Sequence, residues 1–91
     1  MPKFVIEREI PNAGKMSAAE LTKASVESRE ALRQLGTKIQ WVHSYVVGDK
    51  IYCLYISPNE ELIREHSRLS GIPATRIERV YAVIDPTTGE T

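Results

Sequence analysis

The sequence of 91 residues lacks the features that mark several classes of protein. It has a single cysteine, so no internal disulfide can form, as is typical of proteins of the reducing cytoplasm. No apolar run approaches the ~18 residues that a membrane span needs, and the charged opening MPKFVIEREI has no secretory h-region. Lys and Arg, 12 in all, balance 12 Asp and Glu, so no overall field attracts nucleic acid or anionic membrane. We expect a cytoplasmic protein with no nucleic-acid or membrane partner.

Complete catalytic and binding signatures are also absent. The sequence has no CxxC, HxxxH or EF-hand spacing, and no local nucleophile signature of a hydrolase. The stretch GKMS at 14–17 ends like a phosphate-binding loop but lacks the first glycine of that loop. The stretch KIYCLYIS at 50–57 lacks the glycines and the stacking aromatic of the RNA-recognition consensus. These absences argue against hydrolysis and RNA binding.

Strand and helix signals alternate along the chain. Stretches rich in strand-forming residues predict strands at 3–10, 39–47, 50–57 and 76–85. Two helical patterns open on capping boxes, SAAE at 17–20 and SPNE at 57–60. The order β-α-β-β-α-β with right-handed crossovers predicts the ferredoxin-like α+β fold, with a four-stranded antiparallel sheet and both helices on one face. We expect one domain over residues 1–91, with an irregular tail at 86–91.

The central hairpin indicates that both faces of the sheet are buried. Gly48 and Asp49 predict a tight type II′ turn, which sets the register of the two strands beside it. In that register both faces carry apolar or aromatic side chains, although two helices cover only one face. The uncovered face is expected to carry Trp41, Tyr45 and Tyr52. A large apolar face is rarely left exposed, so we predict a homodimer through this face, of the dimeric α+β barrel type.

Polar side chains occupy positions where a plain core has apolar ones. His66 lies between Leu62 and Leu69 on the inner stripe of the second helix. Other polar or thiol side chains are expected to face it from the first helix and the middle strands: Ser25, Ser28, Ser44, Cys53 and Tyr55. Buried polar groups need partners, so this set predicts either a hydrogen-bonded core network or the lining of a ligand pocket. The sequence leaves both interpretations open.

Several short stretches resemble a known bacterial family. They are FVIER at 4–8, Trp41, SYV at 44–46, YCLY at 52–55, SPNE at 57–60, IREH at 63–66, GIPA at 71–74 and Val80. The resemblance spans nearly the whole chain and points to small ferredoxin-like proteins that are catalogued as a domain of unknown function. One branch of the family is described as nickel-binding. The resemblance implies a homodimer in which two sheets face each other.

Two functions are compatible with the sequence. The first is a non-catalytic binding protein for a small ligand or for a divalent metal such as nickel. His66 and the carboxylate of Glu7 are then the expected metal ligands, because borderline metals favour imidazole. The second is a small cofactor-independent oxygenase or isomerase with His66 as general base, because an imidazole pKa near ~6.5 suits that role. We favour the first.

Overall fold

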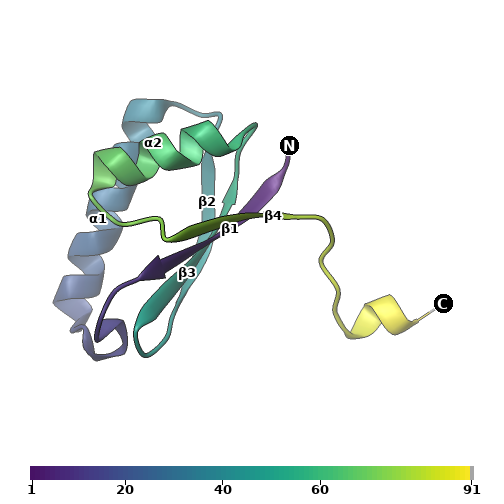
Figure 1. Cartoon of the computed structure of the whole chain (residues 1–91), viewed down its shortest axis with the longest axis horizontal. Helices are drawn as coiled ribbons and strands as arrows, with labels where there is room; N and C mark the ends of the chain where they lie inside the picture. Colours follow the sequence, from purple (N-terminus) through teal and green to yellow (C-terminus); the bar gives the residue numbers. More distant parts are fainter. Residues whose placement is uncertain (91) are drawn as a thin grey trace.

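The structure is a computed structural model that describes residues 1–90, and it has the expected ferredoxin-like arrangement (Figure 1). The elements are β1 (Lys3–Glu9), η1 (Ala13–Lys15), α1 (Ala18–Leu35), β2 (Gln40–Val46), β3 (Lys50–Ile56), α2 (Glu60–Ser70), β4 (Arg76–Val80) and η2 (Pro86–Gly89). The strands form one antiparallel sheet in the order β2-β3-β1-β4. Both α-helices pack on the same face of this sheet (Figure 1).

Local capping explains where the two helices begin. The predicted capping box starts α1, since Ser17 Oγ accepts the Glu20 N–H at 3.1 Å and the Glu20 carboxylate accepts the Ser17 N–H at 3.0 Å. Helix α2 begins later than the SPNE stretch predicts, because Asn59 caps it by accepting the Leu62 N–H at 3.0 Å. Ser57 is instead fully buried, and its hydroxyl donates to the Asn59 carbonyl at 2.7 Å. An asparagine caps a helix as well as a serine does.

The β2–β3 pairing departs from the predicted register at a β-bulge. His43 pairs with Leu54 as expected, but the register shifts between Trp41 and His43. Trp41 consequently pairs with Tyr55 instead of Ile56. An extra residue in one strand turns the side chains beyond it to the opposite face. Trp41 therefore packs against the core on the helix side, and its predicted place on the uncovered face is wrong.

The last strand is shorter than predicted. Strand β4 ends at Val80, and residues 81–85 run away from the body of the molecule as an extended segment (Figure 1). Val80 pairs with Lys3, the first residue of β1, so β1 has no further residue with which the segment could pair. Tyr81 is 87% exposed and Ile84 is 77% exposed. A predicted strand over 76–85 is therefore corrected to 76–80.

The C-terminal tail contains the short 3₁₀ helix η2. Asp85 caps this helix, because its carboxylate accepts the Thr87 N–H at 2.9 Å. We expected an irregular tail over 86–91. The capped turn corrects this for residues 86–89, whereas Thr91 lies outside the described residues.

The core lies between the helices and the sheet. Strand β1 alternates strictly, and Phe4, Ile6 and Arg8 are its buried residues. The central cluster consists of Phe4, Ile6, Ile39, Cys53, Tyr55 and Ile63. Among residues 1–90, no helix has both the length and the hydrophobicity to cross a membrane.

Candidate functional site

A cavity of about 110 Å³ lies between α1 and the inner face of the sheet. Its wall includes Ser25, Ser28, Ser44, Cys53 and Tyr55, the polar and thiol residues that the sequence placed on facing surfaces. Most of the other lining residues are apolar, among them Leu21, Ala24, Ile51 and Ile72. Trp41 and Arg8 complete the polar part of the wall. An apolar cavity with a few convergent polar groups is typical of a small-molecule site.

The hydroxyl groups on the wall differ in what they can offer a ligand. Ser25 donates its hydroxyl proton to the Leu21 carbonyl at 2.9 Å, as serines within helices often do. Ser44 Oγ instead accepts the indole N–H of Trp41 at 2.9 Å. A hydroxyl that accepts a hydrogen bond keeps its own proton for another acceptor. Ser44 is therefore a possible donor to a ligand, and the β-bulge that turns Trp41 inward makes this arrangement possible.

His66 lies behind the cavity wall and does not belong to it. The ring is fully buried, with Nε2 at 3.1 Å from the Ser28 carbonyl oxygen and 3.2 Å from Ser28 Oγ. The ring also packs at a tilt against Tyr55, with 5.1 Å between the centroids. Ser28 and Tyr55 line the cavity, whereas His66 does not. The predicted position of His66 in the pocket lining is wrong, because Ser28 and Tyr55 lie in front of it.

The contacts of His66 define its protonation state. A carbonyl oxygen can only accept, so the ring proton is on Nε2 and points at Ser28. The other nitrogen, Nδ1, is buried and has no hydrogen-bond partner among the described residues. Burial lowers the pKa of His66; the backbone of Ser28 opposes this shift and the charge of Arg8 adds to it. The ring is neutral and does not reach the cavity, so the geometry gives no support to a general base.

Arg8 is a wall residue that our sequence-based site did not include. Its side chain is only 1% exposed and points from β1 toward the helices. The guanidinium carbon lies 5.9 Å from the centroid of the Tyr55 ring, a cation–π distance. The alternation of side chains along β1 could have predicted this burial, because Arg8 lies on the same face of the strand as Phe4 and Ile6. A buried cation on the wall changes which ligands the cavity can accept.

Three of the four Arg8 hydrogen bonds attach β1 to α2 and to the α2–β4 connection. Nη1 donates to Ser67 Oγ at 3.0 Å, to the Pro73 carbonyl at 3.0 Å and to the Ile72 carbonyl at 3.3 Å. Nε donates to Cys53 Sγ at 3.3 Å. Cys53 also lines the cavity, so the guanidinium lies at the junction between the protein core and the cavity.

Glu7 lies on the face of the sheet opposite to His66. It alternates with the buried residues of β1, and its carboxylate accepts hydrogen bonds from Lys50 Nζ at 3.2 Å and from the Tyr52 hydroxyl at 3.4 Å. The hydrogen bond to Glu7 is the main reason why the pKa of Lys50 is raised. The sheet separates Glu7 from His66, so the predicted metal pair does not form. Within residues 1–90, no three His, Cys, Asp or Glu side chains cluster in a way that could hold a metal ion.

The uncovered face of the sheet carries the two tyrosines that we expected there. Tyr45 is 63% exposed and packs edge-on against His43, with 5.0 Å between the ring centroids. Tyr52 pairs with Tyr45 across β2 and β3. Both tyrosines therefore lie on the predicted face, with His43 beside Tyr45, and Trp41 is the one expected member that does not.

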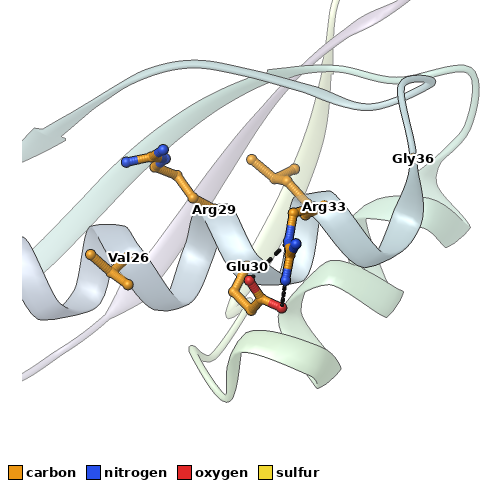
Figure 2. A pocket seen from close by; sticks show the side chains of 6 residues that line it. Val26, Arg29, Glu30, Arg33 and Gly36 are labelled. Atoms are coloured by element: carbon orange, nitrogen blue, oxygen red, sulfur yellow. Dashed lines mark hydrogen bonds and ion pairs between the residues drawn. The ribbon is translucent and has the colours of Figure 1, made fainter.

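A second depression of about 540 Å³ lies along the outer side of α1 (Figure 2). Arg29, Glu30 and Arg33 line it, and Glu30 pairs with Arg33 at 2.8 Å. The Arg33 side chain is 79% exposed, so water screens this ion pair. The depression is larger than the inner cavity, but its charged side chains are exposed on a helix surface. We therefore assign the candidate site to the inner cavity.

The fold and the cavity define a small ferredoxin-like protein with a polar-lined cavity beneath its helices. The family model described as nickel responsive protein SCO4226-like matches residues 4–80, so the chain belongs to this family. The crystal structure of SCO4226 from Streptomyces coelicolor A3(2) has the same fold, with a TM-score of 0.75. The two chains share 17% identity, and the match covers 90% of this chain and 99% of that chain. No curated protein matches the sequence.

Proposed function

We propose that the protein is a homodimeric, non-catalytic binding protein whose ligand site is the cavity between α1 and the sheet. The composition of the cavity wall carries this proposal, because apolar side chains surround a small number of fixed polar groups. An apolar cavity of about 150 Å³ accepts benzene. A cavity of about 110 Å³ therefore suits a ligand of roughly six non-hydrogen atoms or fewer.

The ionisable groups of the wall favour binding over catalysis. Burial is the main cause that raises the pKa of Tyr55, and the phenol therefore stays protonated at neutral pH. Cys53 is buried, and its sulfur accepts the Arg8 Nε–H. His66, the general base of the alternative enzyme hypothesis, does not line the cavity. The Tyr55 phenol can donate a hydrogen bond to a ligand, and no group on the wall is arranged to remove a proton from it.

The uncovered sheet face supports the homodimer. Tyr45 is 63% exposed on this face. Burial of apolar surface stabilises an assembly by about 25 cal/mol per Å². A second copy of the chain offers the same apolar surface in return, as a two-fold interface requires.

The binding function can be tested with four small compounds that share a four-carbon chain: butyrate, butyramide, butanol and butylamine. We expect at least one of them to shift the NMR signals of Ser28, Ser44 and Trp41, which line the cavity. Ala24→Leu places a larger side chain in the cavity, so it is expected to abolish this response and to raise the melting temperature. Binding of none of the four compounds to the unmodified chain contradicts the proposal.

A matched control separates cavity filling from a general effect on α1. Ala19 lies on the exposed side of α1, so Ala19→Leu adds the same side chain outside the cavity. This variant is expected to bind the compounds as the unmodified chain does. Equal loss of binding in Ala24→Leu and Ala19→Leu would place the site elsewhere.

Nickel is a second candidate ligand, and the structure favours a different place for it. The family is described as nickel responsive, and borderline metals favour imidazole. His43 is exposed on the uncovered face, so the proposed homodimer through this face would bring an imidazole from each copy to the interface. One copy provides no cluster of three ligands within residues 1–90. We therefore infer that a nickel ion would be shared between two copies at this face and would not bind at His66.

A further inference from the structure

We infer that the cavity between α1 and the sheet selects a small organic monoanion, namely a short-chain carboxylate, and that Arg8 binds its carboxylate group. This inference rests on the proposed ligand site and adds the chemical class of the ligand. Three observations carry it: an unsatisfied donor on Arg8, the absence of a counter-ion, and the apolar remainder of the cavity wall.

The hydrogen-bond inventory of Arg8 leaves one nitrogen free. A guanidinium has five N–H donors. Nε uses its donor on Cys53 Sγ, and the two donors of Nη1 point to Ser67 and to the carbonyls of Ile72 and Pro73. Nη2 is buried, and it has no partner among the described residues. Because Nη1 and Nε already have partners in the protein, Nη2 is the donor of Arg8 that remains for a ligand.

Arg8 also has no counter-ion among residues 1–90. Arg8 is the only charged residue on the cavity wall, and none of the ion pairs within residues 1–90 includes it. The carboxylate of Glu7 belongs to the opposite face, where it pairs with Lys50. A buried cation without a counter-ion is unfavourable unless a partner neutralises it. A bound carboxylate would supply both the missing charge and an acceptor for Nη2.

The remaining wall groups define the rest of the ligand. Ser44 keeps a hydroxyl proton that can be donated to an anionic head group, because Ser44 Oγ already accepts the Trp41 N–H. Leu21, Ala24 and Ile51 offer an apolar surface to a short hydrocarbon tail. A single positive charge matches one negative charge, so a monoanion fits better than a dianion. The cavity volume of about 110 Å³ limits the tail to a few carbon atoms.

A purely structural role for Arg8 makes a different prediction. The contacts of Nη1 attach β1 to α2 and to the α2–β4 connection, that of Nε attaches it to β3, and none of them needs a ligand. If Arg8 has only this role, the cavity should not distinguish a carboxylate from a neutral compound of the same shape. Butyrate and butyramide form such a pair, since they differ chiefly in the charge of the head group.

The deciding experiment is an NMR titration of the unmodified chain with butyrate and with butyramide. We expect butyrate to bind at least 10-fold more tightly and to shift the side-chain N–H signals of Arg8. Equal affinity for the two compounds overturns the inference about Arg8 but leaves the proposed binding function intact. Tighter binding of butylamine overturns it as well. If none of these compounds binds, both the inference and the proposed function fail.

Two arginine variants complete the test. Arg8→Met removes the charge and is expected to lower butyrate affinity to that of butyramide. Arg79→Met is the matched control, because Arg79 is exposed on β4, where it packs over the Tyr81 ring at 5.4 Å. This control should keep the preference for butyrate. If Arg8→Met does not fold, the comparison of the two compounds on the unmodified chain still decides the question.

Discussion

Nε2 of His66 lies 3.1 Å from the carbonyl oxygen of Ser28, and this contact joins α2 to α1 in the core. The carbonyl can only accept a hydrogen bond, so the contact requires a proton on Nε2 and leaves Nδ1 unprotonated in the neutral ring. A second proton on the ring would place a positive charge in a fully buried position that Arg8 already makes unfavourable. His66 therefore supports the cavity wall only in its neutral form.

The stability of the protein is expected to fall in mild acid because the pKa of His66 is lowered in the folded state. The unfolded chain binds the proton near the ordinary histidine pKa of ~6.5, whereas the folded chain binds it only at lower pH. Between these two values the unfolded state carries more protons, so the free energy of unfolding decreases as pH falls. The decrease reaches at most about 1.4 kcal/mol per pH unit, and full stability is present above pH ~6.5. Urea unfolding at a series of pH values measures it.

Two histidine variants identify the group responsible. His66→Gln retains an N–H donor for Ser28 but does not titrate, so the decline in the window that opens below pH ~6.5 should disappear. His43→Gln removes the exposed imidazole and should retain the decline. The carboxylates with lowered pKa values titrate below this window; they are Glu20, Glu30, Glu65 and Asp85. An undiminished slope in His66→Gln would assign the acid sensitivity to another group.

Gly14 packs against the turn between β2 and β3. Its N–H donates to the Gly48 carbonyl at 2.9 Å, and a Cβ at this position would come within 2.8 Å of the Val47 carbonyl oxygen. The clash is with backbone, so Gly14→Ala must move the loop or the hairpin. We expect this variant to lower the free energy of unfolding by about 1–3 kcal/mol. Thermal and urea unfolding provide the measurement.

Gly48→Ala is the control for Gly14→Ala. A Cβ on Gly48 would meet no atom within 4 Å, and Gly48 has no positive φ angle. The variant is therefore expected to be close to neutral. The φ angle also corrects the predicted type II′ turn, which requires a positive φ at its first central residue. A similar loss of stability in both alanine variants would contradict the close contact at Gly14.

The sequence predicted the fold well where several local signals agree. The Ser17 capping box and the inward positions of Ser25 and Ser28 on α1 follow from spacing that does not depend on distant contacts. The β-bulge before His43 could not be predicted in this way. Trp41 and Val42 are both apolar, so a shift of one residue still leaves an apolar side chain on each face. The hydrophobic pattern therefore does not distinguish the two registers, and tertiary packing decides between them.

The sequence predicted which side chains of the candidate site point inward, but not which of them line the cavity. Helical spacing correctly turns Ser28 and His66 toward the sheet, but periodicity does not tell which of them reaches a cavity and which lies behind it. Arg8 was missed because a charge near the end of a strand usually lies in solvent. Arg8 lies on the same face of β1 as Ile6, which indicates burial. The contacts with Ser67 and the α2–β4 connection, which offset the cost of burying the guanidinium, form only in the folded chain.

The homodimer is expected to depend on Tyr45. If the uncovered faces pair, Tyr45→Lys places a lysine from each copy in the interface, and buried unpaired charges are strongly unfavourable. We expect light scattering coupled to size exclusion to give a dimer for the unmodified chain and a monomer for Tyr45→Lys. Val26→Lys is the control, because Val26 is 54% exposed but lies on α1 on the other side of the molecule. A stable monomer of the unmodified chain at micromolar concentration would contradict the dimer.

Nickel binding is expected to require His43 and the dimer, and to be independent of His66. His43 is exposed beside Tyr45 on the uncovered face, whereas His66 is fully buried and its Nε2 is engaged with Ser28. Calorimetric titration with nickel chloride should therefore show binding to the unmodified chain and to His66→Gln, and a loss of at least 10-fold in affinity for His43→Gln. Tyr45→Lys should lose binding as well, because a monomer presents one imidazole where the proposed site needs two. The ratio of nickel to chain should be close to one ion per dimer.

Binding that survives in His43→Gln but disappears in His66→Gln would instead locate the metal in the core. An unchanged affinity in the monomeric variant would show that one copy is sufficient.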